Sequence, residues 1–203
     1  MSFELVLGTN NAKKLREMKM LLEGIDVQLC SLAEIENSIE VEETGCTFQE
    51  NAELKAVEQA VHLGKWVLAE DSGLSVAALD GSPGILSARF SGANATDETN
   101  NQMLLVLLEG TPRHERSAWY TSHMSLSDPN GVVHISCQAK CHGRILEAPR
   151  GEGGFGYDPL FELVEYHHTF AELGDAVKSM LSHRARANQI FLPQFKRVLT
   201  MLD

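Results

Sequence analysis

The sequence predicts a mixed α/β fold, and two patterns indicate it. Near the N-terminus the apolar run Phe3–Leu7 breaks at a polar turn, and apolar residues then recur at helical spacing from Ala12 onward. From Ser117 the period changes to two, and two alternating segments flank the turn Asp128–Gly131 and end at Ile145. Strand–helix units favour parallel strands and a long hairpin supplies antiparallel ones, so we expect a mixed sheet.

Two more strands and a helix follow this first strand–turn–helix segment. The short apolar run Val27–Ser31 predicts a strand. Thr47 and Glu50 have the spacing of a capping box, which predicts a helix that runs to about Leu63. The apolar run Trp66–Ala69 predicts a buried strand, and we expect this strand to end at the carboxylates that follow it.

Two further helices are expected later in the chain. Thr96 is a suitable N-cap for a helix whose apolar residues recur until Gly110. Ser182 has the same role for the last helix. Pro193 lies inside that helix and is expected to kink it or to split off its first turns, because proline cannot donate a helical hydrogen bond.

Length and composition limit the class of protein. The chain has 203 residues, which suits one domain over 1–203, with two lobes at most, and its 43% hydrophobic and 22% charged content is ordinary for a soluble globular protein. A net charge of −11 argues against general nucleic-acid binding, although a local group of cations can still bind a small anion. No basic segment precedes the first strand and no apolar run is long enough for a membrane span, so we expect neither a signal peptide nor a membrane protein.

The four cysteines indicate a reducing, cytoplasmic location. Cys30, Cys46, Cys137 and Cys141 are too scattered for a disulfide framework. The spacing Cys137-x-x-x-Cys141-His142 could suggest zinc, but it falls in an alternating strand pattern and has no second ligand pair. We therefore expect ordinary core or surface thiols.

Two adjacent carboxylates are the first candidate for chemistry. Glu70 and Asp71 follow the strand Trp66–Ala69, and open α/β sheets place their ligands at the carboxyl ends of strands. Adjacent carboxylates repel each other unless a cation or a shared proton relieves them, and a hard cation such as Mg²⁺ prefers such ligands. Taken by itself, the segment is better explained as a strand that runs into an Asp-Ser-Gly turn.

The turn after the first strand is a candidate anion site. A polar turn from Thr9 to Asn11 leads directly into a helix, whose free N–H groups and dipole point at the turn. Lys14 lies in the first helical turn, where a cation is unfavourable unless an anion is bound nearby. The alternative is ordinary capping by Thr9 or Asn10 together with a surface lysine.

Two later segments also carry unusual residues. Four glycines surround Phe155 and Tyr157, so the backbone allows close approach of a ligand and a ring could stack on a flat heterocycle. A flexible loop anchored by its aromatic side chains is the alternative. His183 and Arg184 place cations at a helix start, as Lys14 does, although such a pair is more often found on a surface.

Together these segments resemble the non-canonical purine nucleoside triphosphate pyrophosphatases, which hydrolyse inosine and xanthosine triphosphates. Each segment is common by itself, whereas the ordered set is specific and covers nearly the whole chain. Asn10 stands where many relatives have glycine, and asparagine tolerates the left-handed backbone better than most residues. The matching segments are Thr9–Lys14 (Thr-x-Asn-x-x-Lys), Glu43–Gly45, Thr47–Ala52 with Lys55, Glu70–Leu74, Ser87–Phe90, Gly153–Pro159 and Ser182–Arg184.

The resemblance implies a two-lobed α/β fold around a long central mixed sheet, with the active site in the cleft between the lobes. It also implies a homodimer, Mg²⁺ dependence, and release of a nucleoside monophosphate and pyrophosphate. The implied metal ligands are Glu43 and Asp71, with Glu70 near them, and Asp71 would be the base that acts on the attacking water.

The resemblance also implies which residues bind the substrate. Thr9, Asn11 and Lys14 would hold the triphosphate, with Asn10, Ala12 and Lys13 in the same turn; Lys55 and Ser72 would contact phosphates, and Arg89 is a further candidate. Phe155 would stack on the purine, Gly156, Tyr157 and Asp158 would shape its pocket, and Lys178, His183 and Arg184 would read the base edge.

Three other functions compete with this one. A nucleotide-binding regulator without turnover has little use for a metal-and-base pair such as Glu43 and Asp71. A pyrophosphatase for modified pyrimidines is disfavoured by the loop Gly153–Asp158 and by the Ser-His-Arg segment. An NAD-binding Rossmann domain is excluded because no Gly-x-Gly-x-x-Gly follows the first strand.

Overall fold

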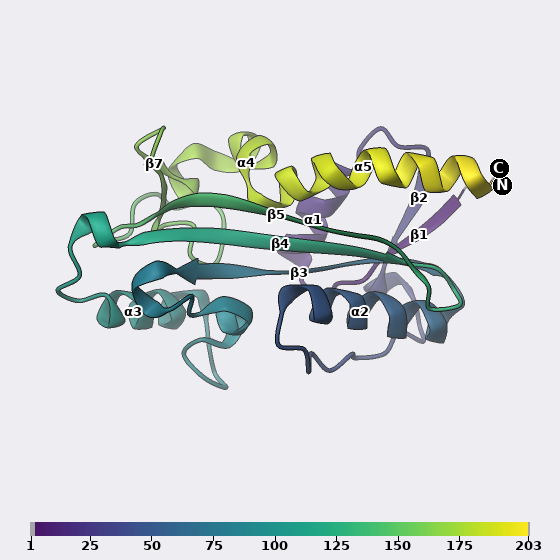
Figure 1. The fold of residues 1–203 in the computed structure, drawn as a ribbon, viewed down its shortest axis with the longest axis horizontal. Coiled ribbons are helices and arrows are strands. Elements are labelled where there is room, and N and C mark those ends of the chain that lie inside the picture. The colour runs from purple at the N-terminus through teal and green to yellow at the C-terminus, as the bar shows by residue number, and fades with distance from the viewer. Residues whose placement is uncertain (1–2, 203) are drawn as a thin grey trace. The chain divides into compact units, whose positions relative to one another are not determined.

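The computed structural model describes residues 3–202 (Figure 1). Its strands form one sheet in the order β2-β1-β3-β4-β5-β6-β7. The strands are β1 (Phe3–Leu7), β2 (Val27–Ser31), β3 (Trp66–Val76), β4 (Ser117–Ser127), β5 (Val133–Ile145), β6 (Phe161–Leu163) and β7 (His168–Thr169). The helices are α1 (Ala12–Leu21), α2 (Phe48–Leu63), α3 (Asp97–Leu107), α4 (Phe170–Leu181) and α5 (His183–Leu202).

The sheet is mixed, as the sequence predicts. Strand β1 pairs in parallel with β2 and β3, whereas β6 pairs antiparallel with β5 and β7. Strands β4 and β5 are neighbours that form the predicted hairpin, and the Gly131 N–H donates to the Asp128 carbonyl in its turn at 3.0 Å. The Asp128 side chain also accepts from the Asn130 and Val132 N–H groups, so this aspartate fixes the turn.

The chain divides into two compact units. The first contains the described residues up to Asp71, Ser122–Ala139, and the chain from Arg184 onward; the second contains Ser72–Thr121 and Lys140–His183. Strands β3, β4 and β5 contribute residues to both units. The chain passes from one unit to the other at four places, and two of these, Asp71–Ser72 and His183–Arg184, lie in predicted site segments.

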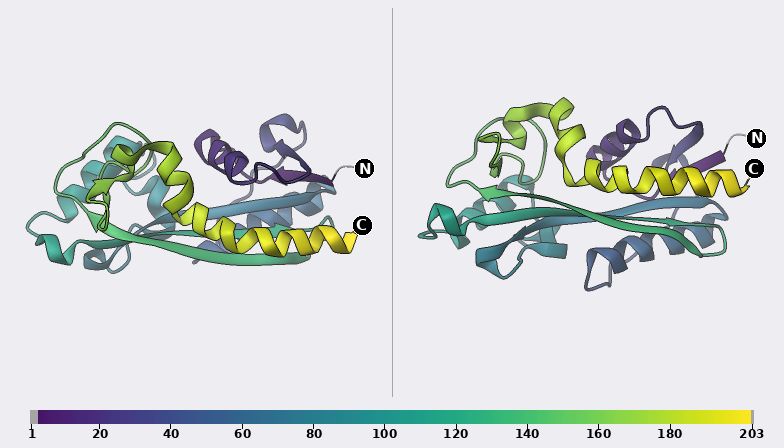
Figure 2. Two further views of the ribbon diagram at one scale, coloured as in Figure 1. Left: turned by 90° about the horizontal axis from the view of Figure 1, so that it is seen from above. Right: turned by 45° about the horizontal axis from the view of Figure 1, so that its top comes forward.

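The first unit is a three-layer α/β/α structure. Leu5 and Leu7 of β1 pack with residues of α1 and α5, such as Met18 and Phe191, on one face of the sheet. Val6 points to the other face, where it packs with Ala60 of α2, because successive side chains of a strand alternate between faces. Figures 1 and 2 show α5 along β4 and β5, with α2 on the opposite face.

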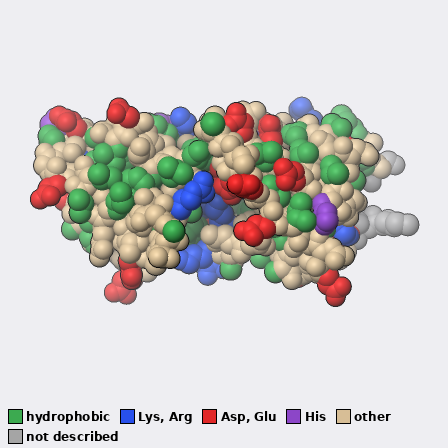
Figure 3. Space-filling view, turned by 90° about the horizontal axis from the view of Figure 1, so that it is seen from below, with side chains coloured by type: hydrophobic (Ala, Val, Ile, Leu, Met, Phe, Trp, Pro, Cys, Tyr) green, Lys and Arg blue, Asp and Glu red, His purple; other side chains and the backbone are tan. Residues whose placement is uncertain are grey.

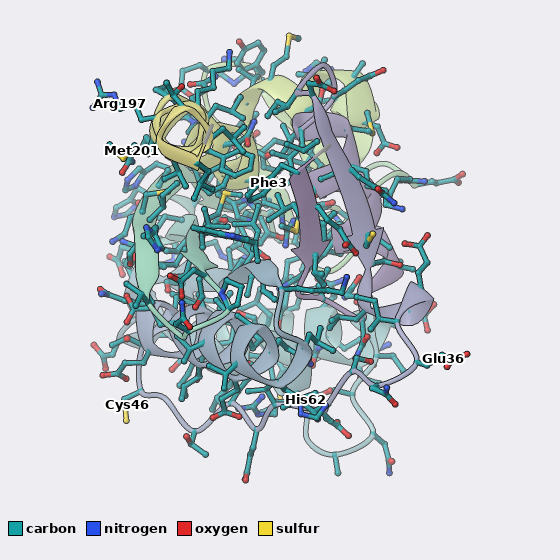
Figure 4. The ribbon with its side chains drawn as sticks, turned by 90° about the vertical axis from the view of Figure 1, so that its right-hand side faces the viewer. Phe3, Glu36, Cys46, His62, Arg197 and Met201 are labelled. Atoms are coloured by element: carbon teal, nitrogen blue, oxygen red, sulfur yellow. The ribbon has the colours of Figure 1, made fainter. Side chains whose placement is uncertain are left out.

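At one end of the first unit, some side chains point into the interior and others point outward. Phe3 points into the interior, where its ring lies 5.5 Å from the Trp66 ring and 5.7 Å from the Phe195 ring (Figure 4). Arg197 and Met201 of α5 point outward in the same view. Aromatic packing thus joins the first strand, β3 and the last helix, which lie far apart in the sequence.

The second unit has its own core. Leu74 and Val76 of β3 pack with Leu104 of α3 and with two aromatic rings from β6 and α4. These rings, of Phe161 and Phe170, are stacked with their centroids 5.6 Å apart. The core therefore fixes α3 together with α4, the helix that carries Lys178 of the candidate site.

Two structural expectations need correction, and some elements were not predicted. Strand β3 does not end at Ala69 but continues through the carboxylates to Val76, because cations and buried apolar residues surround that stretch. Of the two alternatives for Pro193, a split of the helix is wrong, because Pro193 lies inside one continuous helix α5, and a kink stays a prediction. The sequence patterns also did not predict α4, whose two parts meet at Gly174 with φ of 75°, or the short strands β6 and β7.

The expectation of ordinary core or surface thiols agrees with the structure. All four cysteines are free thiols, and Cys137 and Cys141 are buried in the cores. Within residues 3–202, no three side chains of His, Cys, Asp and Glu form a group suited to a metal ion. No helix in the described part of the chain is long and apolar enough to cross a membrane.

The predicted capping box of α2 is confirmed and leads to a stability prediction. Thr47 Oγ1 accepts from the Glu50 N–H at 3.1 Å, and the Glu50 carboxylate accepts from the Thr47 N–H. We expect Thr47→Ala to lower the free energy of unfolding by about 1 kcal/mol, because a helix N–H loses its partner. Urea unfolding measures this change. Thr200→Ala on the exposed side of α5 is the control, and an equal loss in both variants would contradict the assignment.

Candidate functional site

The turn between β1 and α1 is organised by Asn11. Its Oδ1 atom accepts from the N–H groups of Lys13 and Lys14 at 3.0 and 3.1 Å, and Thr9 Oγ1 accepts from the Asn11 N–H at 3.2 Å. The N-cap is therefore Asn11, and the alternative of capping by Thr9 or Asn10 is wrong. The cap uses the amides that an anion could have bound, so the Lys14 side chain is the stronger candidate for a phosphate contact.

Glu70 and Asp71 have separate surroundings. They are consecutive residues of β3, so their side chains point to opposite faces of the sheet. Glu70 lies 3.1 Å from both Lys14 Nζ and Arg184 Nε, and it accepts from Ser122 Oγ at 2.9 Å. Extension of the strand through both residues therefore separates two carboxylates that the sequence alone places together.

Asp71 shares a cation with Glu43. Lys55 Nζ lies 3.0 Å from Glu43 Oε1 and 3.1 Å from Asp71 Oδ1, and the Lys55 side chain is only 14% exposed. Burial by itself lowers the pKa of Lys55, but Asp71 and Glu43 outweigh burial and raise that pKa above its ordinary value. Burial also raises the pKa of Asp71, against the opposing effect of Lys55. Both carboxylates thus lie against the Lys55 ammonium, at a position where a positive charge is needed to balance them.

Asn51 connects the two acidic segments. Its Oδ1 accepts from the Gly45 N–H at 2.8 Å, and its Nδ2 donates to Asp71 Oδ2 at 3.3 Å. A Cβ atom at Gly45 would lie 2.6 Å from Asn51 Oδ1, so this approach requires glycine. One buried amide therefore ties the loop that carries Glu43 to the strand that carries Asp71.

A second group of predicted residues meets in the other unit. Lys178 Nζ lies 2.6 Å from Asp158 Oδ2 and 4.1 Å from the centre of the Phe155 ring. The same carboxylate oxygen accepts from the Phe155 N–H at 2.9 Å. Asp158 and Lys178 are both almost fully buried, so this ion pair fixes the loop and holds a cation against the aromatic ring.

A sequence model of the Ham1 family matches residues 5–194 of this chain. The chain belongs to the Ham1 family. A Rhodopirellula baltica protein named dITP/XTP pyrophosphatase is 53% identical over 197 residues, which cover 97% of this chain and 95% of that protein. A Geobacter sulfurreducens protein with the same name is 49% identical over 90% of this chain and 92% of its own length.

Solved Ham1 structures have the same fold as this chain. The HAM1 protein of Coxiella burnetii has a TM-score of 0.86 and 38% identity, and the match covers 98% of this chain and 99% of that one. The Staphylococcus aureus Ham1 protein has a TM-score of 0.84 and 38% identity, with 98% and 100% covered. The mixed α/β fold predicted from the sequence is confirmed.

Two neighbouring residues that were predicted to act together, His183 and Arg184, lie in different units of this Ham1 chain. His183 stacks on Tyr120 in the second unit, with ring centroids 4.7 Å apart. Arg184 belongs to the first unit, where it lies 2.7 Å from Glu17 and 3.1 Å from Glu70. The structure therefore holds Arg184 among acidic side chains, and its reading of the base edge stays a prediction.

Three further predicted residues differ in their exposure. Ser72 is half-buried in β3 directly after Asp71, and Arg89 is exposed at the end of the 3-10 helix η3 (Gly84–Arg89). Tyr157 is buried and donates from its hydroxyl to the Ser87 carbonyl at 2.8 Å, so it fixes the loop from within. Burial raises the pKa of Tyr157 well above its ordinary value, which keeps this hydroxyl protonated as a donor.

The role of Asn51 was not predictable from the sequence, although this residue lies inside a matching segment. Its place one position after the capping residue Glu50, on a helix with small side chains, is the only local signal that it carries. That signal gives no sign of the contact with Asp71, because the two residues are 20 positions apart.

The surface explains how an acidic chain can bind an anion. Lys and Arg side chains lie beside Asp and Glu side chains on the face in Figure 3, although the net charge is −11. A local group of cations can outweigh the net charge at short range, so the overall acidity does not exclude a polyanionic ligand.

Proposed function

We propose that this Ham1 chain hydrolyses the non-canonical purine nucleoside triphosphates ITP, dITP and XTP to the nucleoside monophosphate and pyrophosphate. The observation that carries the proposal is the arrangement of Glu43, Lys55 and Asp71, in which two carboxylates converge on a buried cation. The names of the curated relatives support the same activity. A nucleotide-binding regulator without turnover is the competing function, and it gives no reason for this costly acidic pair.

We place Mg²⁺ on Glu43 and Asp71. Their oxygens suit a hard divalent cation, and the ammonium of Lys55 already lies where the two carboxylates converge. Held by these residues, Mg²⁺ would supply charge neutralisation and would make a water molecule more acidic. We assign Glu70 to the positioning of Lys14 and Arg184 instead, since its contacts are with these two cations.

The reaction needs positioning and charge neutralisation more than covalent help from the protein. Asp71 accepts the proton of the water that attacks the α-phosphate, and Asn51 orients its carboxylate. Lys14 and Lys55 neutralise the charge that develops on the departing pyrophosphate. Thr9, Asn11 and the adjacent residues of the turn, together with Ser72 and Arg89, are assigned to the phosphates, as the family resemblance implies.

The base is assigned to the second unit. Phe155 stacks on the purine, and Lys178 offers N–H donors beside it. Hypoxanthine and xanthine carry a 6-keto acceptor where adenine has an amino donor. Adenine would therefore leave an N–H donor of Lys178 without a partner. A buried donor without a partner costs about 1–3 kcal/mol. We infer that this mismatch selects the keto base. His183 and Arg184 are further candidates for this role.

Pyrophosphate release tests the proposed function. We expect Mg²⁺-dependent release from dITP and XTP at least about 10-fold faster than from dATP, because one mismatched donor is worth that factor. Chelation of Mg²⁺ should abolish release, and Lys178→Met should reduce the preference for dITP over dATP. Tight binding of dITP without release would support the regulator instead.

We include in the proposal the homodimer that the resemblance implies. Light scattering measures the molar mass in solution and tests this assembly.

A further inference from the structure

Helix α3 holds a loop of the candidate site through Asn100. The Asn100 amide Nδ2 donates to the carbonyls of Ser87 and Ala88 at 3.4 and 3.2 Å. Its Oδ1 accepts from the N–H and the hydroxyl of Ser91 at 2.8 and 2.9 Å. Asn100 is only 4% exposed, so this network is buried, and it fixes the segment on both sides of Arg89.

The next residue of the same helix holds the loop Gly153–Asp158, which carries Phe155 and Tyr157. Asn101 Nδ2 donates to the Gly156 carbonyl at 2.9 Å. The other side-chain atom, Asn101 Oδ1, is buried and has no hydrogen-bond partner among the described residues. The amide is therefore oriented by its bond to Gly156, which has a left-handed φ of 60° and lies directly after Phe155.

The two loops are also joined to each other. The Tyr157 hydroxyl donates to the Ser87 carbonyl, the same carbonyl that accepts from Asn100. On the other side of the loop, the Asp158 carboxylate accepts from the Phe155 N–H and the Lys178 ammonium. The loop is thus held at three points, and the contact with Asn101 is the one that comes from an element with no assigned role.

Helix α3 is suited to act as a fixed support. Thr96 caps its first turn by accepting from the Thr99 N–H at 3.1 Å. Leu104 and the following Leu108 are fully buried in the core of the second unit. A helix that is fixed at its N-terminus and in the core transmits a defined position to Asn100 and Asn101.

We propose that Asn101 is a positioning residue for base recognition, which acts by holding the Gly156 carbonyl and thereby the orientation of the Phe155 ring. Asn100 has the matching role for the segment that carries Arg89. The proposal rests on the proposed function, because it assigns the purine to Phe155. It adds a determinant of specificity that touches neither the substrate nor the metal.

The test compares Asn101→Ala with Gln102→Ala, which changes an exposed amide of the same helix. Loss of one hydrogen bond predicts a rise of about 3- to 10-fold in the KM for dITP, with kcat nearly unchanged, and a smaller preference for dITP over dATP. Inhibition by inorganic tripolyphosphate should stay the same, because this ligand has no base. Gln102→Ala should match the wild type in every measurement.

A second variant covers the case in which alanine prevents folding. Asn101→Asp keeps the shape of the side chain but replaces the donor with an oxygen facing the Gly156 carbonyl, so it should show the same rise in KM. Faster hydrogen exchange in residues 153–158 than in the wild type should accompany either variant.

The possible outcomes are distinct. An unchanged KM and an unchanged dITP preference in both Asn101 variants, with an active wild type, overturn the positioning role only. An equal weakening of tripolyphosphate inhibition also overturns it, because the defect is then general. A wild type that releases no pyrophosphate from dITP overturns the proposed function and this inference with it.

Discussion

Replacement of Asp71 by asparagine is expected to lower kcat for pyrophosphate release from dITP by about 10³-fold, because a general base contributes about 10²- to 10⁴-fold. Asparagine keeps the shape of the side chain but cannot accept the proton of the attacking water. Burial already disfavours the charged form of Asp71, so the variant should still fold. Steady-state release at saturating dITP and Mg²⁺ measures the effect, and thermal unfolding verifies the fold.

Asp80→Asn is the matched control, since Asp80 is exposed and its left-handed φ of 51° is compatible with asparagine. This control should release pyrophosphate at the wild-type rate. Release that survives in Asp71→Asn would move the base to another residue. Glu70 would then be the next candidate, although its contacts with Lys14 and Arg184 argue for a different role.

Lys55→Met is expected to have the second largest effect, with kcat/KM for dITP reduced by about 10²- to 10³-fold, as for the loss of a donor that stabilises developing charge. A second readout follows from the contacts of Lys55. The ammonium occupies oxygens of both Glu43 and Asp71, so in the absence of nucleotide it competes with a metal for them. We therefore expect Mn²⁺ to bind this variant more tightly than the nucleotide-free wild type.

Calorimetric titration with Mn²⁺ measures the second effect without any turnover. Lys65→Met is the matched control, because Lys65 pairs with Glu4 near the start of β3 instead. Its Mn²⁺ affinity and its activity should equal those of the wild type. Weaker Mn²⁺ binding in Lys55→Met would show that Lys55 supports the metal site rather than competing with the metal for it.

The sequence by itself determined the family and the local structure. The segments from Thr9 to Arg184 indicate a nucleoside triphosphate pyrophosphatase by their residues and their order alone. The strand–turn–helix start, the Thr47 capping box and the hairpin turn at Asp128 were all predictable, because each depends on residues within a few positions of one another. Local hydrogen bonds and short hydrophobic periods follow directly from the order of the residues.

Only the tertiary structure decided which of these residues act together. Sequence proximity left open whether Glu70 and Asp71 share a cation, and extension of β3 places their side chains on opposite faces. Asn51 and Asn101 acquire roles only because the fold brings them to Asp71 and Gly156, which are 20 and 55 positions away. Such contacts follow from packing between distant segments, and no local pattern encodes packing of that kind.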